Sequence, residues 1–187
     1  MKTIGVLALQ GAFIEHEKVL KELGVQPLEV KHKEDLDAID GIILPGGEST
    51  SQGGLLQSEG LLEPLKEKIE QGLPTLATCA GSILLSKQIE DQQEVYLQTL
   101  PVTIRRNAFG RQINSFKSRG MFLSTAVEMV FIRAPFFTQV DPGVQIISKV
   151  DDHIVAVQYH NQIALSFHPE LTQDPTIHSY FINTLLV

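Results

Sequence analysis

In the first half of the chain, short apolar runs alternate with stretches of helical spacing, and few folds accommodate such a pattern. The run Thr3–Leu9 is almost continuously apolar, which is typical of a strand buried on both faces of a sheet. Further strands are predicted at Val25–Val30, Gly41–Leu44 and Pro74–Ala77. Alternation of this kind favours an α/β fold with a mostly parallel central sheet flanked by helices in a flavodoxin-like, three-layer arrangement.

Helices are predicted between these strands. The first runs from about Phe13 to Leu23, and Gly24 is a suitable stop signal. The remaining helical signals are a cap among Ser49, Thr50 and Ser51, the spacing of Leu62, Leu65 and Ile69, a stop at Gly72, and the segment Ala80–Lys87.

The second half of the chain has strand-like runs with few helical signals between them. They are Val102–Arg105, Arg111–Phe116, Glu128–Arg133, Val144–Val150, Ile154–Tyr159 and Ile163–Phe167. The pair around His160-Asn161 indicates a tight hairpin, so antiparallel strands are expected to join the parallel core. A final helix would place Ile177, Phe181 and Leu185 on one face. Since no long linker or internal repeat interrupts the chain, residues 1–187 are predicted to form a single domain.

Composition excludes several classes of function. The net charge of −7 gives no basic surface for nucleic acid, and the cluster of Arg105, Arg106 and Arg111 is too small to change this. No apolar run approaches the ~18 residues of a membrane span, and the first run ends without the cleavage site of a signal peptide. The single cysteine rules out an internal disulfide. A cytoplasmic protein that binds neither nucleic acid nor membranes is expected.

Three predicted strands end in unusual polar or small residues. These ends are Gln10-Gly11, Pro45-Gly46-Gly47-Glu48-Ser49-Thr50 and Thr78-Cys79-Ala80-Gly81. In open parallel sheets, ligands bind beyond the carboxyl ends of the strands. If the three strands are parallel, their ends converge on one candidate site.

Cys79 is the candidate nucleophile at this site. It lies between a short strand and a helix, and its small neighbours Ala77, Ala80 and Gly81 permit the sharp turn that presents a nucleophile in other α/β enzymes. The start of a helix would favour the thiolate and direct N–H groups at an oxyanion. The alternative is that Cys79 is a small, buried core residue.

His168 and Glu170 are the candidate base and its orienting group. Proline holds the residue before it away from helical conformation, and residues two apart on an extended segment point to the same side. Glu170 can therefore orient the imidazole of His168, although His-Pro-Glu also suits a simple strand-to-loop turn. The other histidines, which are His16, His32, His153, His160 and His178, are interpreted as surface or packing residues. None has metal-ligand spacing, so neither a metal nor another cofactor is expected.

The PGGEST loop, residues 45–50, has two interpretations. Its glycines allow close approach to a ligand, which suits an oxyanion and substrate loop. It lacks the Gly-Lys-Ser/Thr of a phosphate-binding loop. The alternative is a turn with a Ser or Thr helix cap, and both can hold together.

Considered together, these motifs resemble one family. LALQGAF, ILPGGEST, TCAG, RRNAFGRQ, FIRAP and FHPELTQD, in this order, are similar to the glutaminase subunits of pyridoxal 5′-phosphate synthase, which are class I glutamine amidotransferases. The resemblance extends from about Lys2 to the C-terminus. It implies hydrolysis of L-glutamine to glutamate and ammonia through a thioester, and transfer of the ammonia to a synthase subunit in a large ring-shaped complex.

The resemblance also implies a role for individual residues. Cys79, His168 and Glu170 match the triad. Those matched to glutamine binding are Gly46, Gly47, Glu48, Ser49, Arg106, Ile132 and Arg133, and Gln10 matches a residue that shapes the oxyanion hole when the partner docks. An arginine can grip the α-carboxylate bidentately. Glu48 would offset the α-ammonium or act through backbone groups.

Some positions depart from the family pattern. Ala77 replaces a usual glycine, and Ser51-Gln52-Gly53-Gly54 replaces a more basic or Met-containing stretch. In Arg111–Lys117, Asn114 and Lys117 stand where the family has acidic residues, which raises the question of partner docking. Two other functions remain open: a glutaminase that serves another synthase, and a non-catalytic protein with Cys79 as a redox sensor.

Overall fold

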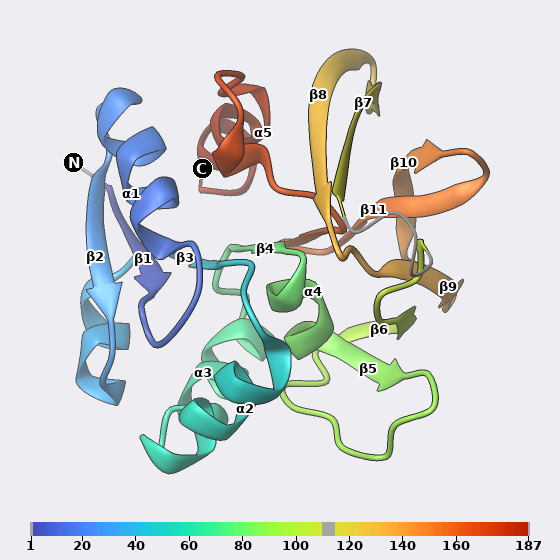
Figure 1. Cartoon of the computed structure of the whole chain (residues 1–187). Helices are drawn as coiled ribbons and strands as arrows, with labels where there is room; N and C mark the ends of the chain where they lie inside the picture. Colours follow the sequence, from blue (N-terminus) through green and yellow to red (C-terminus); the bar gives the residue numbers. More distant parts are fainter. Residues whose placement is uncertain (1, 110–114, 187) are drawn as a thin grey trace.

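The computed structural model describes residues 2–109 and 115–186, and most of these residues are arranged around a mixed β-sheet (Figure 1). Its strands are β1 (Thr3–Leu7), β2 (Gln26–Val30), β3 (Gly41–Leu44), β4 (Thr75–Thr78), β5 (Ser86–Ile89), β6 (Leu100–Arg105), β9 (Phe136–Val140), β10 (Gln145–Val150), β11 (His153–Tyr159) and β12 (Gln162–Leu165). A separate hairpin contains β7 (Ser115–Phe122) and β8 (Thr125–Ile132).

Five short α-helices are present in the described part of the chain. They are α1 (Phe13–Glu22), α2 (Ser49–Ser58), α3 (Leu62–Glu70), α4 (Ala80–Leu85) and α5 (Thr176–Tyr180), with 3₁₀ turns at Lys33–Ala38 and Pro169–Leu171 and a π turn at Phe181–Leu185. Gly24 and Gly72 follow α1 and α3 with positive φ, as the predicted stops require. No helix in the described part of the chain is long and apolar enough to cross a membrane.

The strand order is β2-β1-β3-β4-β12-β11-β9-β6-β5, with β10 paired to β11. The β1–β2, β1–β3, β3–β4 and β4–β12 pairs are all parallel, so the predicted parallel core is confirmed. The carboxyl ends of β1, β3 and β4 therefore meet at one edge, as expected. The last predicted strand, β12, pairs parallel with β4 on one side and antiparallel with β11 on the other.

Each face of the parallel sheet has its own apolar core. On one side Leu56 of α2, Leu65 of α3 and Leu84 of α4 pack together, and on the other side Leu20 of α1 packs with Phe181 after α5. In Figure 1, α1 and α5 accordingly lie on one side of the sheet, and α2, α3 and α4 on the other. Neighbouring residues of a strand contribute alternately to the two cores, because successive side chains of a strand point to opposite faces of the sheet. The predicted α/β, three-layer fold is confirmed.

The second half is largely antiparallel, with some differences from prediction. The hairpin at His160-Asn161 is present between β11 and β12. The predicted helix Ala80–Lys87 ends at Leu85, and the chain continues as β5, which pairs parallel with β6. Neither β5 nor β9 was predicted. The predicted strand Arg111–Phe116 lies partly outside the described residues, and β7 extends it to Phe122.

Candidate active site

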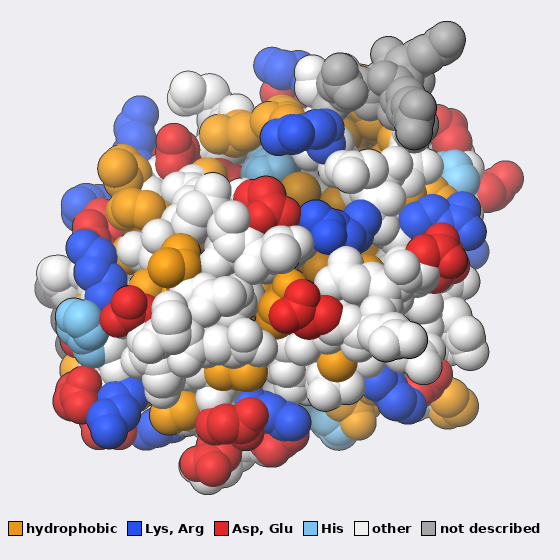
Figure 2. Space-filling view, turned by 60° about the horizontal axis from the view of Figure 1, so that its bottom comes forward, with side chains coloured by type: hydrophobic (Ala, Val, Ile, Leu, Met, Phe, Trp, Pro, Cys, Tyr) orange, Lys and Arg blue, Asp and Glu red, His pale blue; other side chains and the backbone are white. Residues whose placement is uncertain are grey.

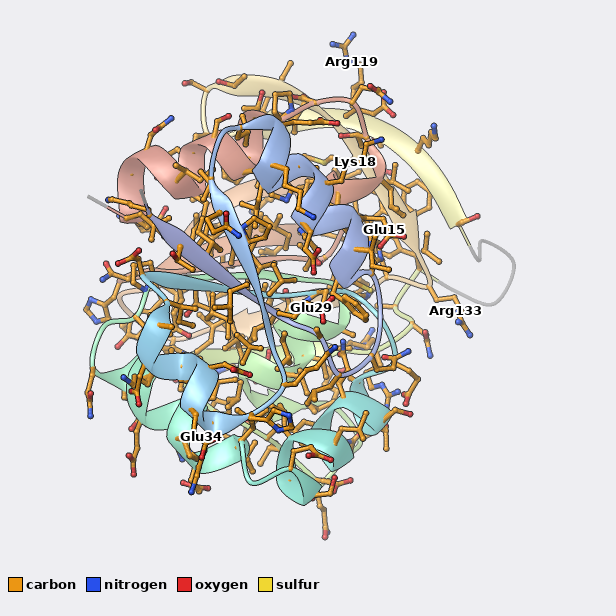
Figure 3. The ribbon with its side chains drawn as sticks, turned by 90° about the vertical axis from the view of Figure 1, so that its left-hand side faces the viewer. Glu15, Lys18, Glu29, Glu34, Arg119 and Arg133 are labelled. Atoms are coloured by element: carbon orange, nitrogen blue, oxygen red, sulfur yellow. The ribbon has the colours of Figure 1, made fainter. Side chains whose placement is uncertain are left out.

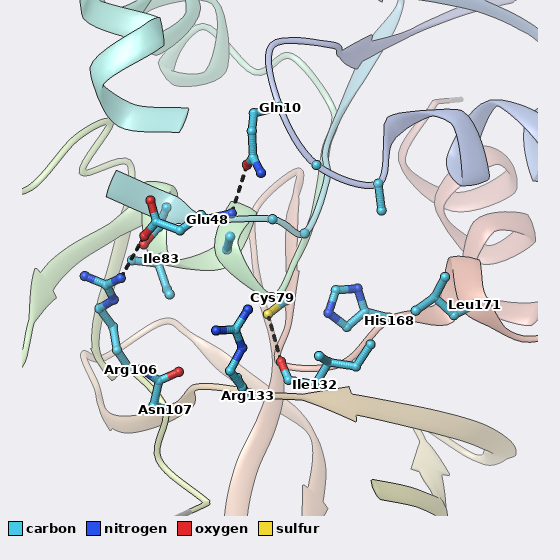
Figure 4. A pocket seen from close by; sticks show the side chains of 16 residues that line it. Gln10, Glu48, Cys79, Ile83, Arg106, Asn107, Ile132, Arg133, His168 and Leu171 are labelled. Carbon is cyan, nitrogen blue, oxygen red and sulfur yellow. Dashed lines mark hydrogen bonds and ion pairs between the residues drawn. The ribbon is translucent and has the colours of Figure 1, made fainter. Parts of the chain in front are cut away.

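A cavity of about 430 Å³ opens at the carboxyl ends of β1, β3 and β4 (Figure 4). The predicted site residues that line it are Gln10, Gly46, Gly47, Glu48, Ser49, Cys79, Arg106, Ile132, Arg133 and His168. The remaining predicted residue, Glu170, lies behind His168. The structure thus brings together side chains from segments that are far apart in the sequence.

Cys79 occupies a sharp turn between β4 and α4. Its backbone has φ 48° and ψ −104°, a conformation that a residue with a side chain rarely adopts. The turn is compact, because a Cβ at Gly81 would come within 2.1 Å of the Leu44 carbonyl oxygen. Cys79 N donates to the Leu165 carbonyl of β12 at 2.8 Å, and Cys79 Sγ lies 3.9 Å from the Ile132 carbonyl oxygen. The strained turn presents the sulfur to the cavity, as a nucleophile elbow does.

His168 and Glu170 are in direct contact. Glu170 Oε1 lies 2.6 Å from His168 Nδ1, and both side chains are almost fully buried. The expected reason for this contact was wrong in part, because Pro169–Leu171 is a 3₁₀ turn and not an extended segment. The turn nevertheless carries Glu170 back toward the imidazole. The carboxylate therefore fixes the ring so that its other nitrogen is free to act.

The charge state of His168 follows from its partners. Burial disfavours the imidazolium, but hydrogen bonding to Cys79 and Glu170 outweighs burial and raises the pKa of His168 to about 10. At neutral pH the ring therefore carries a proton. A protonated imidazole beside the sulfur is the arrangement that stabilises a thiolate nucleophile.

The PGGEST loop contacts both the imidazole and the end of β1. A Cβ at Gly46 would lie 2.2 Å from His168 Cε1, so only glycine allows this backbone to pack against the ring. Glu48 N donates to Gln10 Oε1 at 2.9 Å, which ties the loop to the Gln10-Gly11 tip. The buried Gln52 side chain strengthens this tie by donating to the Gln10 and Pro45 carbonyls.

The helix cap in this loop differs from the prediction. Glu48, and not Ser49, Thr50 or Ser51, caps α2, because its carboxylate accepts from Thr50 N at 3.2 Å and from Ser51 N at 2.7 Å. Glutamate reaches these N–H groups in place of the shorter side chains that usually cap a helix. Ser49 is instead buried in the first turn.

The two candidate arginines differ in their partners. Arg106 Nη2 pairs with Glu48 Oε1 at 3.0 Å, and Arg106 Nη1 donates to Gln92 and Thr50. Arg133 projects into the cavity (Figure 4), and within residues 2–109 and 115–186 it forms no ion pair. Arg133 also has a positive φ of 43°, at the point where the chain leaves β8. Arg133 is therefore the better placed of the two to meet an anion.

The sequence did not indicate the residues behind the His168–Glu170 pair. His16 and His178 were interpreted as surface or packing residues, but both are fully buried, and His16 Nε2 lies 3.5 Å from Glu170 Oε2. One available signal was the helical spacing of His16 and Leu20, which places them on the same buried face of α1. Among the residues that the structure describes, no group of three His, Cys, Asp or Glu side chains is arranged to hold a metal ion.

Comparison with known proteins gives consistent matches along the chain. The model of the SNO glutamine amidotransferase family matches residues 6–187. A protein of Desulfitobacterium hafniense (strain Y51), named pyridoxal 5′-phosphate synthase subunit PdxT, is 52% identical over 184 residues, which cover 97% of this chain and 92% of that protein. A protein of the same name from Clostridium beijerinckii is 52% identical over 184 residues and 97% of each chain.

A solved structure supports the same assignment. A crystal structure of a glutamine amidotransferase superposes with a TM-score of 0.94 at 41% sequence identity, covering 98% of this chain and 99% of that one. Because the family match spans nearly all of the sequence, and the relatives are similar over more than nine tenths of their length, the assignment does not rest on the site motifs alone. The chain belongs to the SNO glutamine amidotransferase family.

Proposed function

We propose that this chain is the glutaminase subunit of a pyridoxal 5′-phosphate synthase, with Cys79, His168 and Glu170 as its catalytic triad. It hydrolyses the side-chain amide of L-glutamine and supplies the ammonia for vitamin B6 biosynthesis. The observation that carries the triad assignment is the convergence of a strained Cys79 turn with a buried His168–Glu170 pair at one cavity. The relatives named PdxT support the choice of synthase.

The reaction begins with attack on the amide carbon. Cys79 Sγ forms a bond to this carbon, and the carbonyl oxygen becomes an oxyanion. We assign its stabilisation to the backbone N–H of Gly47 and to N–H groups of the first turn of α4, since both border Cys79 in the cavity, whereas Gly46 N already donates to Thr78 Oγ1. The tie between Gln10 and Glu48 N supports a role for Gln10 in shaping this loop.

Collapse of the intermediate breaks the carbon–nitrogen bond. The His168 imidazolium gives its proton to the departing nitrogen, which leaves as ammonia, and a thioester on Cys79 remains. His168, now neutral, takes a proton from water as the water attacks the thioester carbon. The carbon–sulfur bond then breaks, which releases glutamate and restores the thiolate. Throughout, Glu170 holds the orientation of the imidazole and stabilises its charged form.

Recognition of free glutamine requires groups for its two charges. We assign the α-carboxylate to Arg133, because its guanidinium projects into the cavity without an ion pair in the described residues. Arg106 acts on the substrate through Glu48, which it holds in place. Glu48 and Ser49 then present the loop to the α-ammonium end. Ile132 contributes through its backbone, which already lies near Cys79.

The proposed partner of the protein is the synthase subunit. A single domain covering residues 1–187 docks on the synthase subunit in a large cytoplasmic assembly. On the face shown in Figure 2, acidic and basic side chains are interspersed, which does not favour a nucleic-acid partner. Of the two departures from the family pattern, Asn114 lies outside the described residues. Lys117 lies 3.7 Å from Glu128 on the neighbouring strand of the β7–β8 hairpin, where it is mostly exposed.

The direct test is release of glutamate from L-glutamine by the purified chain, with and without the synthase subunit. Wild-type protein is expected to release glutamate, and faster when the synthase is present. Cys79→Ala should lower turnover by more than about 1000-fold while its thermal unfolding stays cooperative. Undiminished turnover in Cys79→Ala would refute the mechanism. Equal turnover with and without the synthase subunit would refute the proposal that this subunit is the partner.

A further inference from the structure

A chain of buried polar side chains continues behind the triad. It contains His16 of α1, His178 of α5 and Thr78 of β4, all of which are fully buried. Glu170 Oε1 is occupied by His168, whereas Glu170 Oε2 is buried without a hydrogen bond in the described part of the chain. His16 Nε2 lies 3.5 Å from this second oxygen. A buried carboxylate oxygen is costly to leave unpaired, so the position of His16 requires an explanation.

His178 determines which nitrogen of His16 carries the proton. His16 Nδ1 lies 2.9 Å from His178 Nε2, and one of these nitrogens must donate to the other. Burial lowers the pKa of His178 to about 4, and burial together with His178 and His168 lowers the pKa of His16 well below its ordinary value, so both rings are neutral at pH 7. If His178 Nε2 donates, then His16 Nε2 bears the remaining hydrogen. That tautomer places a donor, and not a lone pair, against Glu170 Oε2.

His16 also reaches the other side of the catalytic imidazole. His16 Nε2 lies 3.3 Å from Thr78 Oγ1, and Gly46 N donates to the same oxygen at 3.0 Å. The backbone of Gly46 in turn packs against His168 Cε1. His16 therefore connects to His168 by two routes, one through Glu170 at Nδ1 and one through Thr78 and Gly46 at Cε1.

We propose that His16, oriented by His178, is a positioning residue that holds Glu170 Oε2 and Thr78 Oγ1 and so keeps the His168 ring aligned with Cys79. This inference rests on the proposed glutaminase function. The 3.5 Å separation is long for a hydrogen bond. Catalytic hydrogen bonds are often long in the free enzyme and shorten when substrate is bound, so the contact is expected to tighten during turnover. Since His16 is not among the described residues that line the cavity, its effect is on kcat and not on glutamine binding.

The test compares two amide replacements of one ring. Glutamine places its side-chain N–H₂ near the position of His16 Nε2, whereas asparagine reaches only to the position of Nδ1. His16→Asn thus loses the contacts to Glu170 and Thr78, and His16→Gln keeps a donor for them. Lys21→Gln is the control, because Lys21 lies on the exposed side of the same helix. Figure 3 labels two other side chains on the exposed side of α1, Glu15 and Lys18.

Glutamate release is measured for each full-length variant in the presence of the synthase subunit, with kcat and KM determined separately. Mutation of the outer-shell partner that orients a metal-ligating side chain typically costs 10- to 100-fold. By the same reasoning His16→Asn is expected to lower kcat by about that factor, with KM within about threefold of wild type. His16→Gln should recover most of the lost kcat, and Lys21→Gln should match wild type. His178→Phe, which removes only the orienting donor, should lower kcat by a smaller factor of about 3 to 10.

Several outcomes would overturn the inference. A kcat for His16→Asn within threefold of wild type would do so. An equal loss in His16→Asn and His16→Gln would show that His16 acts only through packing. If His16→Asn fails to fold, the decision rests on His178→Phe, and wild-type kcat in that variant refutes the proposal. Absence of glutamate release by wild-type protein would instead refute the proposed function itself.

Discussion

Arg106 and Glu48 form an ion pair of 3.0 Å that joins the chain after β6 to the N-cap of α2. The same carboxylate caps α2 by accepting from Ser51 N and Thr50 N. Although burial opposes ionisation, these hydrogen bonds and the charge of Arg106 hold the pKa of Glu48 below its ordinary value. Glu48 is therefore ionised at neutral pH, and its contacts with Arg106, Thr50 and Ser51 hold the PGGEST loop in place.

Replacing Arg106 with methionine should release this loop. We expect KM for glutamine to rise about 10-fold, since the loop must then be ordered by the substrate, at a cost of about 1.4 kcal/mol. Stability should change by less than about 1 kcal/mol, because the pair is partly exposed. Steady-state kinetics and urea unfolding measure the two effects. A large loss of stability with unchanged KM would contradict this role for Arg106.

Gly46→Ala should disable catalysis. The added Cβ would lie 2.2 Å from His168 Cε1, so the imidazole must move away from Cys79. A misplacement of about 1 Å in an active site can cost about 100-fold in rate, and we expect kcat to fall by at least that factor. The rate at which a glutamine-like electrophile modifies Cys79 is a second measurement, and this rate should fall in parallel with kcat. Wild-type kcat in this variant would show that the loop backbone adjusts without disturbing the ring.

The adjacent glycines of α2 provide a matched pair for stability. At Gly53 an added Cβ would come within 1.9 Å of the Tyr96 ring, whereas at Gly54 it would meet no atom within 4 Å. Gly54→Ala should therefore stabilise the protein by about 0.5–1 kcal/mol, as alanine does in a helix interior. Gly53→Ala should destabilise it by about 1–3 kcal/mol through overpacking. Thermal or urea unfolding distinguishes them, and equal changes in the two variants would contradict the packing of Tyr96 on α2.

Stability should depend on pH through the buried histidines. The folded protein keeps His178 neutral down to a pKa of about 4, whereas in the unfolded chain this group titrates near 6.5. Between pH 6.5 and 4 the unfolded chain therefore binds a proton that the folded protein does not, so the free energy of unfolding falls as the pH falls. At pH 4 this one group contributes a loss of roughly 3 kcal/mol.

The comparison variant for this pH effect is His178→Phe. Its free energy of unfolding should decline less steeply than that of wild type between pH 6.5 and 4, as measured by urea unfolding at several pH values. Above pH 6.5 the two slopes should agree, since His178 is neutral in both folded and unfolded wild-type protein. His168, whose pKa is raised, contributes in the opposite direction only above pH 6.5. Equal slopes below pH 6.5 would mean that His178 is not kept neutral by folding.

The parallel half of the fold was predictable because each element carries its own signal. Strands β1, β3 and β4 are mostly apolar runs, and β3 begins and ends where the sequence places it. Strands β5 and β9 were missed for local reasons. In β5 the exposed Lys87 and Gln88 interrupt the apolar pattern, and β9 directly follows Pro135, which is a turn signal.

The candidate site was predictable only where its residues occur at strand ends or in adjacent positions. Cys79, the PGGEST loop and the His168–Glu170 pair satisfy this condition, although their catalytic roles stay predictions. The partners of His16 do not, because Thr78, Glu170 and His178 come from distant parts of the chain and meet only in the folded protein. Helical spacing can indicate that His16 is buried, but not what it contacts.

The place of β12 between β4 and β11 affects how the protein is made in the cell. A nascent chain translated only as far as Asn161 already contains Cys79, but it lacks His168 and the strand that pairs with β4. The exposed edge of β4 would then offer unpaired N–H and C=O groups to other chains. Once Gln162–Leu165 pairs with β4, this edge is covered and His168 arrives at the sulfur. The candidate triad therefore cannot assemble before residues 162–170 have been synthesised.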